Sequence, residues 1–175
     1  ITAASNLTNL LAGFNGEEMG LGLISTLSLS ACIYLLGDLQ TSLYLLTFTF
    51  SFYAFLIYNK YPAKIFPGDT GTLIVGAIIA SFSIIKNIEI VGVVLLFPQI
   101  MEFLFKSIRR FGGKKYGPTK IDKDGILHPQ KYLSVANLLT SNFKLTEKRL
   151  VLVIWSIGAI FGIISIILTY FVMVN

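Results

Sequence analysis

The sequence predicts an all-α fold, a polytopic transmembrane bundle of about five spanning helices. Of its 175 residues, 54% are hydrophobic and only 13% are charged, and the mean hydropathy of +0.75 lies outside the usual range of soluble domains. The apolar residues also fall into runs near the ~20 residues that cross ~30 Å of hydrocarbon. None of these runs alternates as a barrel strand does, so helices are the expected way to satisfy the backbone in a bilayer.

Short polar breaks separate five predicted spans. In chain order these are 19–36, 41–58, 71–85, 90–105 and 150–172. The third span is short, but flanking polar side chains can reach the interface and the bilayer can thin. The polar segment before the first span has no signal-peptide pattern and no initiator methionine, so we expect a helix to precede it. We therefore interpret 1–175 as the C-terminal fragment of one membrane domain.

The basic residues predict the orientation of the spans. Eleven of the 14 Lys and Arg residues lie in the segment 106–149, which the positive-inside rule assigns to the cytoplasm. Counting spans back from it assigns the loops 6–18 and 60–69 to the same face. The opposite face then carries a single basic residue, Lys86. We expect these three segments to meet on the cytoplasmic face.

Two of these loops contain residues suited to binding a ligand. The segment 6–20 is unusually polar for residues next to a membrane span, and Asn15-Gly16 is a strong turn pair. A turn that merely connects two spans would have the same features. Asp69 stands where the third span begins. That position suits an N-terminal cap of the helix, or a ligand of Mg²⁺, and the two roles are compatible.

The third segment, 106–149, is basic and contains the only histidine, His128. Such segments commonly set topology or attract anionic headgroups, and above a polar pocket they would also concentrate a nucleotide diphosphate. A lone histidine in a loop is more often incidental than catalytic. The sequence has no Walker-type phosphate loop, no His/Cys metal cluster and no serine elbow.

Two motifs resemble the polyprenyl-phosphate N-acetylhexosamine-1-phosphate transferase family, of the glycosyltransferase 4 type. Residues 9–20 (Asn-Leu-Leu-Ala-Gly-Phe-Asn-Gly-Glu-Glu-Met-Gly) are similar to its signature Asn-x-x-Ala-Gly-x-Asn-Gly-x-Glu-x-Gly. Residues 61–70 (Tyr-Pro-Ala-Lys-Ile-Phe-Pro-Gly-Asp-Thr) are similar to Tyr-Pro-x-x-x-Phe-x-Gly-Asp-Thr. The resemblance covers nearly the whole chain and is closest to the dolichyl-phosphate N-acetylglucosamine-1-phosphotransferase branch.

The resemblance implies an enzyme that transfers N-acetylglucosamine-1-phosphate from UDP-N-acetylglucosamine to a polyprenyl (dolichyl) phosphate and releases UMP. This is the first membrane step of lipid-linked oligosaccharide synthesis, for protein N-glycosylation or cell-surface glycans. The implied cofactor is Mg²⁺, with Mn²⁺ as an alternative. The expected partners are the two substrates and the lipid bilayer, not nucleic acid, and a homodimer is left open.

The resemblance also implies roles for individual residues. Asp69 would be the catalytic residue and, with Asn9, a ligand of Mg²⁺. Asn15 would contact the uracil beside the backbone of Phe66, and Glu18 would support that loop. The family's Arg-His-Arg pattern, which contacts pyrophosphate and sugar, is missing, which leaves the sugar open. The candidates for that work, all in the basic segment, are Lys114, Lys115, Lys120 and His128.

Two further differences from the family affect the expected activity and source. The family's acidic pair on an earlier cytoplasmic loop is absent, so residues 1–175 alone are expected to be inactive. The segment between the last two spans is shorter than in the eukaryotic enzymes, which favours an archaeal cell membrane over the endoplasmic reticulum.

Two other functions are compatible with apolar spans. A transporter or channel subunit is the alternative from a different class, because polar residues at membrane depth also line permeation paths. The spans contain few ionisable residues, and the clearest exception, Glu102, lies near a predicted cytoplasmic end. A non-catalytic membrane anchor would require neither polar loop. These features favour an enzyme.

Overall fold

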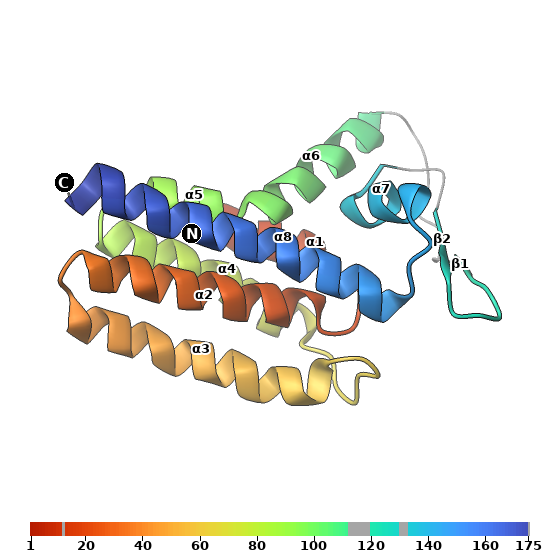
Figure 1. The fold of residues 1–175 in the computed structure, drawn as a ribbon, viewed down its shortest axis with the longest axis horizontal. Helices are drawn as coiled ribbons and strands as arrows, with labels where there is room; N and C mark the ends of the chain where they lie inside the picture. The colour runs from red at the N-terminus through yellow and green to blue at the C-terminus, as the bar shows by residue number, and fades with distance from the viewer. Residues whose placement is uncertain (12, 112–119, 130–132, 175) are drawn as a thin grey trace.

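The computed structural model describes residues 1–11, 13–111, 120–129 and 133–174 (Figure 1). Most of the described residues are helical and few are in strands, which confirms the predicted all-α class. The helices are α1 (Thr2–Leu11), α2 (Glu17–Leu35), α3 (Leu39–Asn59), α4 (Gly68–Ile85), α5 (Glu89–Leu95), α6 (Phe97–Phe111), α7 (Val135–Asn142) and α8 (Glu147–Leu168), which continues into a π-helical segment η1 (Thr169–Val174). Two short strands, β1 (Lys120–Ile121) and β2 (Leu127–His128), form a hairpin.

Four helices of the described part are long and apolar enough to cross a membrane. They are α2, α3, α4 and α8 with most of η1, and they correspond to the predicted spans 19–36, 41–58, 71–85 and 150–172. The protein is therefore a multi-pass membrane protein. In Figure 1 these four helices run alongside one another, and buried aliphatic side chains fill the space between them, among them Leu29, Ile33, Leu45, Val75 and Ile79.

The span predicted at 90–105 is not a single straight helix. The chain forms two helices there, α5 and α6, which are bent by 66° and make a fifth span only if the broken pair is counted as one. Pro98 favours a break here, because proline has no N–H to continue the hydrogen bonds of α5 and is tolerated in the first turn of a new helix. Figure 1 shows α6 leaving the direction of the neighbouring helices.

The expectation of a loop over residues 6–18 is also wrong for its first half, because α1 continues to Leu11. Ala4, Thr8 and Leu11 are buried at helical spacing, and α1 packs against α4. The two helices approach closely at Gly76, where an added Cβ would lie 2.3 Å from the carbonyl oxygen of Ala4. The loop proper is therefore the short connection between α1 and α2.

The basic segment 106–149 is more ordered than a single loop. Its described residues include the end of α6, the β1–β2 hairpin, α7 and the start of α8. Lys120 lies opposite His128 in the antiparallel backbone register of the hairpin. Leu127 is buried with Leu150 and Ile154 of α8. In Figure 1 the hairpin and α7 lie at the end of the bundle where α8 begins and α3 connects to α4.

Candidate active site

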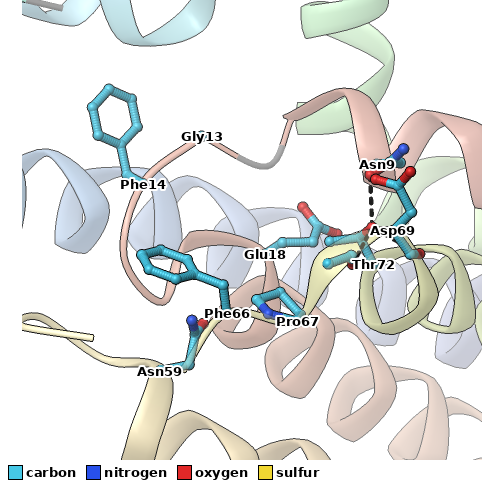
Figure 2. A pocket seen from close by; sticks show the side chains of 10 residues that line it. Asn9, Gly13, Phe14, Glu18, Asn59, Phe66, Pro67, Asp69 and Thr72 are labelled. Carbon is cyan, nitrogen blue, oxygen red and sulfur yellow. Dashed lines mark hydrogen bonds between the residues drawn. The ribbon is translucent and has the colours of Figure 1, made fainter. Parts of the chain in front are cut away.

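A pocket of about 280 Å³ lies where the end of α1 meets the beginnings of α2 and α4 (Figure 2). The two loops that carry the sequence motifs therefore come together, as predicted. The residues that line the pocket are Asn9, Gly13, Phe14, Glu18, Asn59, Phe66, Pro67, Gly68, Asp69 and Thr72.

Asn9 and Asp69 lie side by side in this pocket and are connected through Thr72 (Figure 2). The Thr72 hydroxyl donates to Asn9 Oδ1 at 2.7 Å and lies 3.1 Å from the main-chain oxygen of Asp69. The Thr72 carbonyl accepts a hydrogen bond from the Thr8 hydroxyl at 2.8 Å, which fixes α1 against α4. The structure thus brings together two residues that are sixty positions apart in the sequence.

Asp69 is not the N-terminal cap of its helix, so that alternative is wrong. The capping position of α4 is Pro67, and no side chain bonds the free amides there. Asp69 lies in the first turn, is exposed, and among the described residues its carboxylate forms no hydrogen bond or ion pair. The carboxylate is free to bind a ligand.

The loop between α1 and α2 is shaped by Glu17, which the sequence analysis did not single out. Glu17 is 1% exposed, and its Oε2 accepts the main-chain N–H groups of Gly13 and Phe14, each at 3.0 Å. Gly16 has a φ of 79°, a conformation that favours glycine, as the Asn15-Gly16 turn predicted. The acidic pair Glu17-Glu18 at the start of the span was the available signal in the sequence.

Glu18 and Asn15, both predicted substrate-binding residues, have different positions. Glu18 lines the pocket, is 2% exposed, and its Oε1 accepts a hydrogen bond from Gln99 Nε2 at 3.4 Å. Asn15 is not among the lining residues, and its main-chain N–H donates to Glu147 Oε1 at 2.9 Å. Glu18 is therefore part of the pocket wall, whereas Asn15 lies on the turn beside it.

Two phenyl rings form the side of the pocket away from Asn9 and Asp69 (Figure 2). They belong to Phe66, whose side chain is 71% exposed, and to Phe14, which the sequence analysis did not assign. Buried Asn59 fixes the Phe66 loop by donating to the Ile65 carbonyl at 2.9 Å. The exposed ring of Phe66 can stack on a nucleobase, whereas the ring of Phe14 is partly buried against the cluster that contains Leu11 and Leu150.

Two of the four basic candidates lie on the hairpin. Lys120 and His128 are exposed, and neither lines the pocket. His128 Nε2 is 3.6 Å from Asp122 Oδ2. The pKa of the Asp122 carboxyl is lowered, mainly by the main-chain N–H of Asp124 and also by His128. The other two candidates, Lys114 and Lys115, lie outside the described residues.

The donor atoms of Asn9 and Asp69 suit a hard divalent cation. Mg²⁺ prefers carboxylate and carbonyl oxygens, and it takes few protein ligands because phosphates and waters complete its octahedron. Asn9 Oδ1 accepts one hydrogen bond from Thr72, and an amide oxygen has a second lone pair. Within the described ranges no three His, Cys, Asp or Glu side chains are grouped to hold a metal.

Fold and pocket together define a class: a multi-pass α-helical membrane protein with a pocket lined by carboxylate, amide and aromatic side chains at one end of its helices. Residues 1–87, which contain both motifs, match the model of glycosyl transferase family 4. The chain belongs to this family.

Related proteins align with nearly the whole chain. A Methanocaldococcus jannaschii protein provisionally named a glycosyltransferase is 38% identical over 172 residues, which are 97% of this chain and 57% of that protein. A Saccharolobus solfataricus protein provisionally named UDP-N-acetylglucosamine–dolichyl-phosphate N-acetylglucosaminephosphotransferase is 36% identical, over 96% of this chain and 52% of that protein. The phospho-N-acetylmuramoyl-pentapeptide-transferase of Staphylococcus carnosus is 34% identical, over 93% and 47%. The chain spans about half the length of these curated relatives.

Proposed function

We propose that the natural protein containing this chain transfers N-acetylglucosamine-1-phosphate from UDP-N-acetylglucosamine to a polyprenyl phosphate of the dolichyl type and releases UMP. The observation that carries the proposal is the pocket in which the free Asp69 carboxylate lies beside Asn9. Membership of glycosyl transferase family 4 supports the reaction class. The lipid substrate is consistent with a pocket at the end of membrane-spanning helices.

In this proposal Asn9 and Asp69 hold Mg²⁺, or alternatively Mn²⁺, through Oδ1 and the carboxylate. A bound cation would neutralise the negative charge that develops on the pyrophosphate during transfer. Thr72 orients Asn9 by donating to Oδ1, and the α1–α4 contact keeps Asn9 near Asp69. The pocket would also hold the nucleotide sugar and the lipid phosphate next to each other. This makes their reaction effectively intramolecular and supplies much of the rate enhancement that the cation does not.

The nucleotide would occupy the side of the pocket formed by the two phenyl rings. Phe66 offers an exposed face on which uracil can stack, and Asn15 lies on the adjoining turn. Glu17, the first residue of α2, supports the turn by accepting the amides of Gly13 and Phe14, and Glu18 lines the pocket beside it. We propose that four residues of the basic segment contact the pyrophosphate or the sugar: Lys114, Lys115, Lys120 and His128.

The names of the relatives and the distribution of charge support a particular sugar and cellular location. Archaeal relatives carry names that specify N-acetylglucosamine, whereas the staphylococcal names specify a phospho-N-acetylmuramoyl-pentapeptide. Identity is higher to the archaeal proteins, which favours N-acetylglucosamine and an archaeal cell membrane. The concentration of Lys and Arg in 106–149 supports a pocket on the cytoplasmic face. We also propose that the chain is the C-terminal half of the transferase domain.

The test uses membranes containing the natural protein with labelled UDP-N-acetylglucosamine, dolichyl phosphate and Mg²⁺. Wild type should form UMP and lipid-linked sugar in equal amounts, only with the cation present. Asp69→Asn should reduce the rate by on the order of 100-fold or more, since even indirect supports of metal ligands are worth about 10- to 100-fold. Asp124→Asn, on the exposed turn of the hairpin, is the matched control and should keep the wild-type rate.

Two results would contradict the proposal. One is full activity in the Asp69→Asn variant, which would remove that carboxylate from the reaction. The other is the absence of product with any UDP-sugar from folded wild-type protein, which would favour the transport function instead.

A further inference from the structure

One face of α6 carries polar side chains that are buried inside the protein. Gln99, Glu102 and Lys106 follow one another at spacings of three and four residues, and Gln99 and Glu102 are 0% and 4% exposed. The other face of α6 exposes apolar residues such as Phe103 and Ile108. Buried polar groups are costly unless they are paired, so the partners of this face indicate what it does.

Lys106 binds the end of the helix that carries Asn9. Its ammonium donates a hydrogen bond to the main-chain oxygen of Leu10, in the last turn of α1. The last carbonyls of a helix have no partner within the helix, and a cation there is favoured by the helix dipole. Lys106 therefore caps α1 at the residue that directly follows Asn9.

Glu102 holds Lys106 in this position and connects it to α7. Its Oε1 lies 3.1 Å from Lys106 Nζ, and its Oε2 accepts the main-chain N–H of Val135, the first residue of α7, at 2.8 Å. Both carboxylate oxygens are thus occupied at a site that is almost fully buried. Three elements, α1, α6 and α7, meet at this ion pair.

α1 is also held by α4, against which it packs. The Thr8 hydroxyl donates to the Thr72 carbonyl at 2.8 Å, and the Thr72 hydroxyl donates to Asn9 Oδ1 at 2.7 Å. Asn9 consequently lies in a helical turn that is held both by Thr72 of α4 and by Lys106 of α6. Loss of either contact would let this turn move relative to Asp69.

We propose that Lys106, supported by Glu102, is a positioning residue that keeps Asn9 oriented for binding a divalent cation together with Asp69. This inference rests on the proposed function, because it takes Asn9 and Asp69 as the cation ligands. Lys106 itself does not line the pocket. Its effect passes through the main chain of α1 and does not require contact with the substrate.

The test measures binding of Mn²⁺ alone to the natural protein in detergent, by the loss of the free Mn²⁺ signal in electron paramagnetic resonance. Lys106→Met should raise the dissociation constant about 10-fold, the lower end of the range for supports of metal ligands. Lys106→Arg keeps a cation that can cap α1 and should stay within about threefold of wild type. Lys86→Met is the matched control, because Lys86 also forms an inter-element ion pair, with Asp38, but lies outside the pocket.

A double variant separates positioning from the effect of an unpaired charge. In Glu102→Gln/Lys106→Met a neutral amide replaces the carboxylate that Lys106 paired with, but the Leu10 carbonyl has still lost its cap. Cation affinity should remain weakened to about the same degree as in Lys106→Met. Recovery of wild-type affinity in the double variant would overturn the proposal, as would unchanged affinity in folded Lys106→Met.

Hydrogen exchange distinguishes this proposal from the proposed function. The amides in the last turn of α1 should exchange faster in Lys106→Met than in wild type, and Lys86→Met should leave them unchanged. If wild type binds no Mn²⁺ but this exchange pattern is found, the proposed function fails while the anchoring of α1 stands. If exchange in α1 is unaffected by Lys106→Met, the positioning role is refuted whatever the metal data show.

Discussion

The close approach of α1 and α4 gives a sharp prediction about Gly76→Ala. An added Cβ would lie 2.3 Å from the Ala4 carbonyl oxygen, 2.5 Å from its carbonyl carbon and 2.7 Å from Ser5 Cα. All three atoms are main chain, so no rotamer change can relieve the clash and α1 must move. Overpacking of this kind costs about 1–3 kcal/mol. Because α1 carries Asn9, the movement should also disturb the pocket.

Gly158→Ala is the matched control for this substitution. It introduces the same methyl group into another buried helical glycine, where the nearest atom is Leu21 Cδ2 at 2.5 Å, the end of a side chain that can change rotamer. Any gain in helix propensity is similar in the two variants, so the difference between them isolates the clash. We expect Gly76→Ala to be less stable than Gly158→Ala by about 1–3 kcal/mol.

The assay is thermal unfolding of both variants in the same detergent, followed by a Mn²⁺ titration of the folded proteins. Gly76→Ala should show the lower unfolding midpoint and the weaker cation binding. Equal midpoints and equal cation affinity in the two variants would refute the close α1–α4 contact and its role in placing Asn9.

Two further predictions concern Glu17 and the opposite end of the bundle. Glu17→Ala removes the acceptor of the Gly13 and Phe14 amides. These two hydrogen bonds are worth about 0.5–1.5 kcal/mol each. The affinity for UDP-N-acetylglucosamine, measured by calorimetry, should therefore fall about 5- to 150-fold. Glu17→Gln keeps an oxygen that can accept both bonds and should bind within about fivefold of wild type, so equal losses in both variants would contradict this role. At the other end, the hydrogen bond from Lys86 lowers the pKa of the Asp38 carboxyl below its ordinary value of 3.8. The stabilisation is therefore present above that ordinary value and is lost as the pH falls below it. Unfolding midpoints measured between about pH 6 and about pH 3 should fall less steeply for Asp38→Asn than for wild type, and identical slopes would exclude the effect.

Most of the membrane-spanning helices could be predicted from the lengths of the apolar runs in the sequence. The spans at α2, α3, α4 and α8 are recognisable because a bilayer requires about 20 apolar residues per helix, whatever the neighbouring helices do. The broken fourth span was not predicted, although Pro98 was visible. A proline can be accommodated in a membrane helix by a kink, and only the packing of the buried side chains of α6 decides that the chain turns by 66°.

The motif residues of the site were predictable in part. Asn9 and Asp69 were identified from their motifs, and both line the pocket. Glu17 and Thr72 were not identified, because their roles depend on contacts: two amides of a preceding turn for Glu17, and the amide oxygen of a residue on another helix for Thr72. A polar residue at the start of a span has the same local sequence whether it binds a ligand, caps a helix or supports a neighbouring loop.

The sequence by itself determined the helical class, the approximate spans and the two motif-bearing loops, since hydropathy and motif spacing are properties of the chain alone. Only the tertiary structure decided that Asp69 does not cap α4, that Asn9 lies on a helix, and that Lys106 of α6 holds the end of that helix. The Lys106–Leu10 hydrogen bond joins residues far apart in the sequence, and the bounds of α1 and α4 depend on the packing of these two helices against each other. Which of several possible partners a polar group receives is settled only when the helices pack.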